Sequence, residues 1–163
     1  MAESTVVKNA RDGTIAITNG TRTYTVALEA DDFSFSGANA GNYERTPIED
    51  RGEFSHNRKT KRKYIAFTFT AWMRDISDAT DVTLPSICLQ TGACASDVST
   101  AGANADSYEV TIVWTVNGTV HGDAANHSIT MTRCTVDSVD IAEAEDKNTV
   151  SISGTCYSTI TYA

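Results

Sequence analysis

The chain has 163 residues and a formal net charge of −8, so its length suits one domain, and its charge disfavours tight binding to nucleic acid phosphates. Threonine is the commonest residue at 24 copies, and there are only two prolines, a composition that favours β-strands. The polar start, Met1 to Asp12, lacks the apolar run of a signal peptide, and no apolar stretch approaches the roughly 20 residues that cross a bilayer. We therefore expect synthesis in a cytoplasm and no membrane partner.

The first expected element is a β-hairpin around Asn19-Gly20. Asn-Gly favours the positive φ angles of a two-residue type I′ turn, which would place Thr18 opposite Thr21. In that register one face of the hairpin is apolar, and it comprises Ile15, Ile17, Tyr24, Val26 and Leu28.

Two further strands are expected on either side of a long segment without clear periodicity. Phe33 and Phe35 alternate with serines, and apolar residues alternate with threonines from Ile65 to Met73. Tyr64 and Trp72 fall on the opposite side of the longer strand. Apolar groups on both faces indicate a strand at a sandwich centre or a subunit contact.

The segment from Gly37 to Lys63 between these strands is expected to be a long assembly loop, because irregular loops of this size in compact domains usually have a function. Its end, from His56 to Lys63, holds five of the 13 basic residues, so the rest of the chain carries 8 basic and 21 acidic side chains. A cationic loop on an anionic body favours head-to-tail association of copies. A solvated charge run or a weak nucleic-acid patch is the alternative interpretation.

The second half of the chain is expected to contain one short helix and more strands. Thr83 as N-cap, Pro85 in the first turn and Gly92 after the end predict a helix over Leu84 to Thr91. A second hairpin is expected after the Asn117-Gly118 turn. The remaining expected elements are a strand over Glu109 to Val116, a long strand from about His127 to Ile141, an acidic turn over Glu143 to Asn148, and a final strand with Val150, Ile152, Cys156, Ile160 and Tyr162 on one face.

Together these patterns predict an all-β fold of about eight strands, a β-sandwich or open barrel with one flanking short α-helix and the long extended loop. The four cysteines, Cys88, Cys94, Cys134 and Cys156, lack paired CxxC spacing and are expected to be buried free thiols.

The sequence predicts no catalytic residue, no cofactor and no metal. It lacks a nucleophile elbow, a zinc-protease helix and a phosphate loop. His121, Asp123 and His127 resemble the ligand set of a non-haem iron site, but all three fall in one loop, whereas the distal histidine of such a site comes from a strand much farther along the chain. We therefore expect a non-enzymatic protein.

As a whole, the layout resembles the tail tube proteins of siphophages. The resemblance rests on the polar arm before Gly13-Thr-Ile-Ala-Ile-Thr18, the Phe33-Ser-Phe35 strand, the loop to Lys63, the single helix, and the closing segment from Asp146 to Tyr157. It implies a virion structural protein, assembled in the host cytoplasm, that forms hexameric rings stacked into a tail tube. Its partners would be other copies, the terminator, tape measure and distal tail proteins, and DNA that passes through without specific binding.

In such a tube the long loop reaches an adjacent ring, and the arm over residues 1–12 bridges subunits. The candidate assembly residues are Arg51, His56, Arg58, Lys59, Lys61, Arg62, Lys63, Tyr64 and Trp72. Three alternatives remain open. One is another virion part, such as a connector, tail terminator or capsid decoration protein. The second is a carbohydrate-binding adhesin with Tyr64 and Trp72 as its platform, and the third is an enzyme that uses the histidine cluster.

Overall fold

A computed structural model of the chain describes residues 13–26, 29–39, 41–75, 79–98, 106–122, 124–143 and 145–163. The arm over residues 1–12, Leu28 and Asp123 lie outside this part. The elements, in chain order, are β1 (Gly13–Thr18), β2 (Thr23–Val26), β3 (Glu29–Ser36), β4 (Tyr43–Asp50), β5 (Glu53–Arg62), β6 (Ile65–Trp72), α1 (Leu84–Leu89), β7 (Val110–Val116), β8 (His127–Ala142), β9 (Thr149–Cys156) and β10 (Ile160–Tyr162), with short 3₁₀ helices at Gly92–Cys94 and Gly118–His121.

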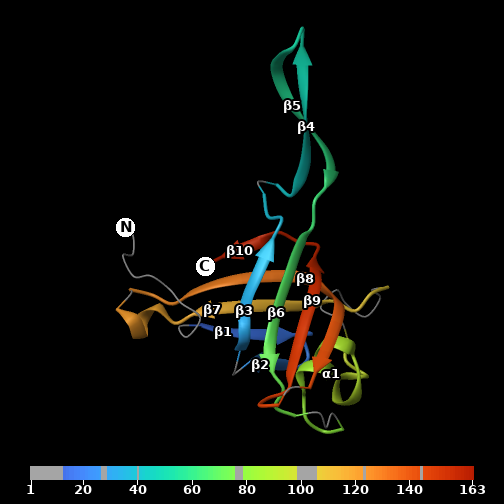
Figure 1. Ribbon diagram of the computed structural model, residues 1–163, viewed down its shortest axis with the longest axis vertical. Coiled ribbons are helices and arrows are strands. Elements are labelled where there is room, and N and C mark those ends of the chain that lie inside the picture. Colours follow the sequence, from blue (N-terminus) through green and yellow to red (C-terminus); the bar gives the residue numbers. More distant parts are fainter. Residues whose placement is uncertain are drawn as a thin grey trace.

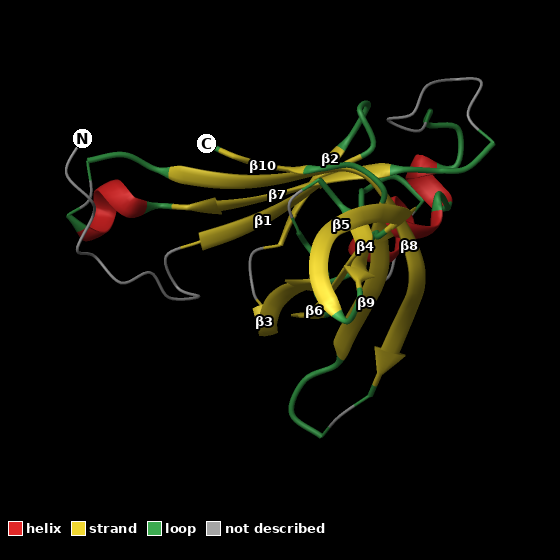
Figure 2. Ribbon diagram, turned by 90° about the horizontal axis from the view of Figure 1, so that it is seen from above, coloured by secondary structure: helices red, strands yellow, loops and turns green. Residues whose placement is uncertain are grey.

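Eight of the strands form one antiparallel sheet in the order β2-β1-β7-β8-β9-β6-β3, with β10 on β8. The 16-residue strand β8 connects two layers, because its first part pairs with β7 and β10 and its second part pairs with β9. Its register against β7 shifts between Met131 and Cys134, where Arg133 has a φ of 55°. Such a bulge bends a strand, and β1 and β7 run across the direction of β3, β6 and β9 (Figures 1 and 2).

The core lies between the two layers. Ile15, Ile17 and Ile112 from one layer and Phe67 and Phe69 from the other are all at most 2% exposed. The ring of Phe33 on β3 lies 6.0 Å from the ring of Phe69 and 6.0 Å from the ring of Trp114 on β7, so it contacts both layers. The predicted all-β sandwich with one short helix is confirmed.

The helix begins as expected but ends earlier. The Thr83 hydroxyl accepts a hydrogen bond from the Ser86 amide, and the Ser86 hydroxyl accepts one from the Thr83 amide. The helix stops at Leu89 because Gln90 adopts the left-handed conformation, with a φ of 55°. The expected extension to Thr91 is therefore wrong, and Gly92 begins a 3₁₀ turn.

The first hairpin has the predicted apolar face but a different register. Thr18 pairs with Thr23, and Ile15 pairs with Val26, so the connection has four residues and every pair is shifted by two positions. The side chain of Asn19, which is fully buried, accepts hydrogen bonds from the amides of Thr21 and Arg22. The wider, four-residue loop forms because these two hydrogen bonds of the Asn19 side chain stabilise it. A shift of two leaves each side chain on its predicted face.

The other differences concern strand ends. The segment after Asn117-Gly118 is not a tight turn: β8 begins only at His127. The predicted final strand is two strands, because β9 ends at Cys156 and β10 pairs with β8 instead of continuing beside β6. Ile160 and Tyr162 therefore belong to a separate strand.

All four cysteines are free and buried, as predicted. Burial raises the pKa of the Cys88 thiol to about 12. Cys134 lies opposite Cys156 in the β8–β9 pair, and the hydrogen bond to Cys156 together with burial raises the pKa of Cys134. Within the described residues, no helix combines the length and apolar character that crossing a membrane would require.

Candidate assembly surfaces

The segment that was expected to be an irregular loop is a two-stranded hairpin that projects from the sheet (Figure 1). Strands β4 and β5 are connected by Arg51 and Gly52, whose φ angles of 53° and 82° are those of a two-residue type I′ turn. Every residue from Glu44 to Tyr64 is exposed. The alternation of apolar and polar residues is absent because neither face of this hairpin is buried.

The base of the hairpin is fixed to the sandwich by side chains. The Tyr64 ring lies edge-on to the Tyr157 ring, with centroids 4.7 Å apart. The Asn42 amide group donates to the carbonyl of Ser158 at 3.4 Å. Since Tyr157 and Ser158 lie between β9 and β10, these contacts set the direction in which the hairpin leaves the sheet.

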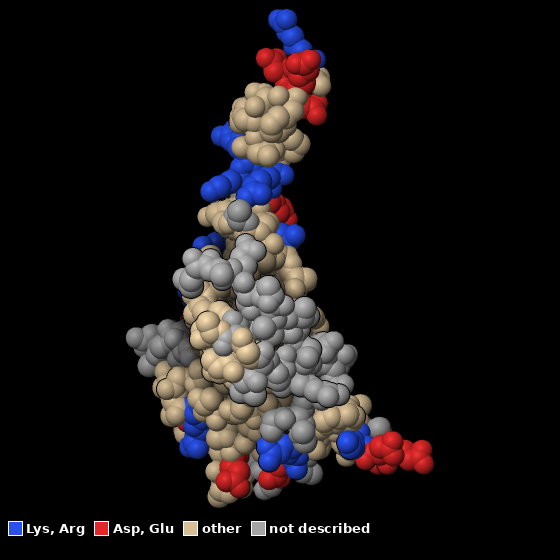
Figure 3. Space-filling view, turned by 90° about the vertical axis from the view of Figure 1, so that its left-hand side faces the viewer, with Lys and Arg blue, Asp and Glu red and all other residues tan. Residues whose placement is uncertain are grey.

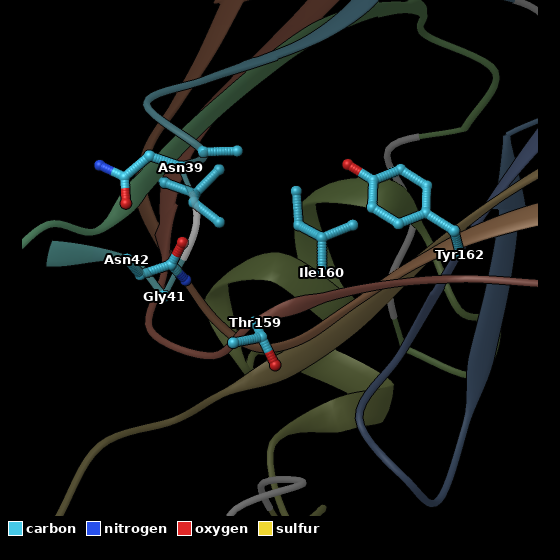
Figure 4. A pocket seen from close by; sticks show the side chains of 8 residues that line it. Asn39, Gly41, Asn42, Thr159, Ile160 and Tyr162 are labelled. Carbon is cyan, nitrogen blue, oxygen red and sulfur yellow. The ribbon is translucent and has the colours of Figure 1, made fainter.

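A pocket of about 400 Å³ lies beside this base (Figure 4). Asn39 and Asn42 come from the chain that enters β4, and Ile160 and Tyr162 come from β10. Asn39 orders the entering chain, because its side-chain oxygen accepts from the Tyr43 amide and its amide group donates to the Tyr43 carbonyl. The pocket thus separates the hairpin base from strand β10.

Charges on the hairpin are arranged in bands (Figure 3). Around the turn, Glu49, Asp50 and Glu53 surround Arg51. Phe54, 65% exposed, and Ile48, 37% exposed, follow below the turn. The stem near the sandwich is mainly basic, because next to the single acid Glu44 it carries Arg45, Arg58, Lys59, Lys61 and Arg62. The expected basic run is therefore only one part of the hairpin, and the tip has the opposite sign.

Most of the candidate assembly residues lie on this hairpin. His56 pairs with Ile48, and Lys59 lies opposite Arg45 with its Nζ 5.1 Å from the centre of the Tyr43 ring. Lys63 donates its amide hydrogen to the carbonyl of Asn42 at the hairpin base. Trp72 is separate, because it ends β6 at the other end of that strand, where the Nζ of Lys147 lies 4.9 Å from the centre of its ring.

The position of Trp72 matters for the adhesin alternative. Tyr64 precedes the first residue of β6, whereas Trp72 is the last, so about 25 Å of strand separates them. The outward positions between them are Ala66, Thr68 and Thr70. The two aromatic side chains therefore do not form one platform.

The end of the sandwich opposite the hairpin carries acidic side chains. β6 runs from the hairpin base to Trp72, and the amide of the next residue, Met73, donates to the carbonyl of Asn148. This contact places the turn between β8 and β9, with exposed Glu143, Glu145 and Asp146, at the far end of β6. The basic stem and the acidic turn thus lie beyond opposite ends of β6, and the acidic hairpin tip lies farther out than the stem.

Several strand edges are open within the described part of the chain. Strand β2 pairs only with β1, β3 only with β6, and β10 only with β8. The hairpin β4–β5 forms a separate two-stranded sheet whose strands pair only with each other. Open edges present unpaired backbone groups that another chain can pair with.

The histidine cluster can be placed only in part. His127 begins β8 and lines an apolar pocket of about 490 Å³ with Trp114, Val116, Ile129 and Tyr162. His121 ends a 3₁₀ helix, and Asp123 is outside the described part. Among described residues, no group of three or more His, Cys, Asp or Glu side chains is arranged to hold a metal ion.

Three solved structures show where this fold occurs. The chain is similar to one in the PVC sheath/tube terminator of an extracellular contractile injection system in the extended state, with a TM-score of 0.61, 9% identity, and coverage of 100% of this chain and 99% of that chain. It is similar to one in the anti-feeding prophage cap, the AFP tube terminating cap, with a TM-score of 0.60, 10% identity, and coverage of 100% and 95%.

The third similar chain is in the virion of a native gene transfer agent particle, with a TM-score of 0.53, 11% identity, and coverage of 96% of this chain and 99% of that chain. No protein-family model and no curated protein sequence matches the chain. Likeness at these identities establishes a shared fold.

Proposed function

We propose that this protein is a non-enzymatic structural component of a phage tail or tail-like particle, in which copies form rings that stack into a tube. The observation that carries the proposal is the full-length likeness to chains of three such particles. Its specific form is a tail tube protein of the siphophage type in hexameric rings. The partners would then be further copies, other tail proteins, and DNA in transit.

The projecting hairpin supports association between copies. An isolated two-stranded hairpin is at best marginally stable in water, and both faces of β4–β5 are exposed. A neighbouring copy that covers Phe54 and Ile48 would remove apolar surface from water. The hairpin is long enough for this contact to lie well outside the sandwich of its own chain.

The charge distribution gives that association a direction. The basic stem of one copy and the acidic β8–β9 turn of another attract each other, and in one chain they lie beyond opposite ends of β6. Contacts between different patches of identical chains repeat head to tail, which suits stacking. The open edges of β2, β3 and β10 provide pairing sites for neighbours within a ring.

Negative-stain electron microscopy of the concentrated protein tests the proposal. Tubes of stacked rings are expected from the wild-type chain. Replacing Arg58, Lys59, Lys61, Arg62 and Lys63 by Glu should prevent stacking without unfolding the sandwich, because the hairpin contributes no residue to the core. The control replaces Lys59, Lys61 and Lys63 by Arg, which preserves the charge and should leave tubes intact. A protein that stays monomeric at every concentration would contradict the proposal.

A tube terminator is the second candidate, since two of the similar structures are a terminator and a terminating cap. Terminators close a tube, so this candidate predicts rings that do not stack further in the same experiment.

A further inference from the structure

The outer surface of the layer β3–β6–β9–β8 consists mainly of hydroxyl side chains. We call this surface the hydroxyl face. It comprises the outward-facing residues within four segments: 34–36 of β3, 66–70 of β6, 151–155 of β9 and 135–140 of β8. Its central row crosses all four strands and is Ser34, Thr68, Ser153 and Ser138. The inward neighbours of these residues, such as Phe67 and Ile152, form the core. Alternation along the strands therefore separates a dry side from a hydroxylated one.

The charges on the hydroxyl face have one sign. Asp137 and Asp140 are exposed there, and the described residues of this face include no Lys or Arg. Lys147 lies beyond its end, with its ammonium over Trp72. The cations of the hairpin stem lie beyond the opposite end of β6.

Hydrogen bonds within the face engage several of its hydroxyl protons. Thr155 donates to Asp137 at 2.7 Å, and Ser138 donates to Asp140 at 3.1 Å. Since a serine has one hydroxyl proton, the 2.8 Å contact between Ser138 and Ser153 uses the proton of Ser153. The two carboxylates thus engage hydroxyl protons of β8 and β9 that would otherwise be free to donate to a ligand.

This chemistry is unsuited to holding a polyanion. Proteins bind phosphates through Lys, Arg, free hydroxyl groups and amides, and here cations are absent from the described face and several hydroxyl protons are engaged. A wall that combines carboxylates with hydroxyl groups and carries no cation repels phosphates while remaining hydrated. Such a wall lets a nucleic acid move along it.

We propose that the hydroxyl face lines the channel of the tube and is the surface along which duplex DNA slides. This inference rests on the proposed function. The outer surface of the other layer, where Thr14, Thr25 and Thr111 lie, is also rich in threonine, but neither Asp137 nor Asp140 extends onto it. It would face outward from the tube.

Cysteine accessibility in assembled tubes tests the assignment. Thr68→Cys places a thiol at the centre of the hydroxyl face, and Thr25→Cys places one on the other layer; both positions are exposed in the single chain, and the four native cysteines are buried. In free subunits, both variants should react with a maleimide attached to a large polyethylene glycol. In tubes, Thr68→Cys should lose this reaction but keep its reaction with N-ethylmaleimide, and Thr25→Cys should keep both.

The outcomes separate the two proposals. If neither variant nor the wild-type chain forms an ordered polymer, the proposed function is wrong, and this inference falls with it. If tubes form and Thr68→Cys still reacts with the large reagent, or Thr25→Cys is protected in its place, the tube stands and the channel assignment is overturned.

A gain-of-binding variant provides a second measurement. Replacing Thr68, Ser151 and Ser153 by Lys should make tubes that were assembled with short duplex DNA retain it in a nuclease-resistant form at low salt and release it at high salt. The matched control replaces Thr14, Thr25 and Thr111 by Lys, and any DNA it holds should be digested. Nuclease-resistant DNA in the control rather than in the first variant would overturn the assignment.

Discussion

Tyr64 packs edge-on against Tyr157, with ring centroids 4.7 Å apart and ring planes at 61°. Tyr64 lies between β5 and β6, and Tyr157 lies between β9 and β10. The pair therefore connects the base of the projecting hairpin to the segment between β9 and β10. Because the hairpin itself is exposed, this contact and the Asn42–Ser158 hydrogen bond determine how rigidly it is presented to another copy.

Tyr64→Ala should loosen the hairpin more than it destabilises the fold. An aromatic pair contributes about 0.5–1.5 kcal/mol beyond its buried area, and both rings are more than a third exposed. Hydrogen exchange should accelerate in β4 and β5 while the core strands keep their protection. Leu89→Ala, which removes a side chain that is 54% exposed on α1, is the control and should leave exchange in the hairpin unchanged.

Asn19→Ala should destabilise the fold by about 2 kcal/mol, because the buried Asn19 oxygen accepts from two amides and its nitrogen donates to Asp97. Asn117 also precedes a glycine, but its side chain makes no capping hydrogen bond at the start of its 3₁₀ helix. Asn117→Ala should therefore cost much less. Urea unfolding of the two variants measures the difference, and equal losses would disprove the role of Asn19.

The turn at Asn19 shows which features of the fold can be predicted from the sequence and which cannot. Asn-Gly correctly predicts a turn at this place, and Gly20 has the expected positive φ of 92°, but Asn19 does not have a positive φ, so the predicted type I′ turn is wrong. The sequence does not reveal that the Asn19 side chain donates a hydrogen bond to Asp97, 78 residues away. This hydrogen bond favours the wider loop. Apolar alternation, in contrast, predicted the face of every buried residue in β1 and β6, since burial on one face is a property of the strand itself.

The hairpin was missed for a related reason. Hydrophobic periodicity reports burial, and the residues of β4 and β5 from Glu44 onward are exposed, so there was no period to detect. Pro47 added a further signal against a strand. The chemistry of the candidate site was easier to identify than its shape: the basic run from Arg58 to Lys63 is visible in the sequence, whereas its band-like separation from the acidic tip depends on the β4–β5 register.

Acid should weaken the contacts that Asp97, in the segment after α1, makes with Asn19 and Arg22 in the first turn. The hydrogen bond from Asn19, supported by Arg22, lowers the pKa of Asp97 below its ordinary value. A carboxyl group whose pKa is lower in the folded state stabilises the fold above its unfolded-state pKa, and this contribution disappears as the pH falls through the folded-state pKa. The free energy of unfolding of the wild-type chain should therefore decline in this acidic range.

Asp97→Asn tests this, because the variant carries no titrating group at that position. Its stability should be lower than that of the wild-type chain at neutral pH, and the two curves should converge as the pH falls. Urea titrations at a series of pH values provide the comparison. Parallel curves would show that Asp97 does not contribute to the pH dependence.

Gly154→Ala should be strongly destabilising although Gly154 is an ordinary strand residue. A Cβ at this position would overlap the carbonyl oxygen of Thr135 and lie 2.5 Å from Cζ of Phe67. The first neighbour is backbone of the adjacent strand, so repacking cannot remove the overlap, and we expect a loss of about 3 kcal/mol. Ser151→Ala, on the same strand but facing outward, is the control. Equal thermal unfolding temperatures for the two variants would refute the packing argument.

Phe54→Ser should reduce assembly without changing the stability of the single chain. Phe54 is 65% exposed, pairs with Glu49 near the hairpin tip, and has no place in the core, so its apolar surface gains burial only from another copy. Full burial of such a side chain contributes about 1.5–3 kcal/mol, which corresponds to roughly a tenfold or greater rise in the concentration at which tubes appear.

Leu89→Ser is a matched control, because Leu89 is 54% exposed on α1, away from the hairpin. Sedimentation of tubes over a concentration series measures the threshold. If Phe54→Ser and Leu89→Ser shift it equally, the hairpin tip has no special part in the contact between copies.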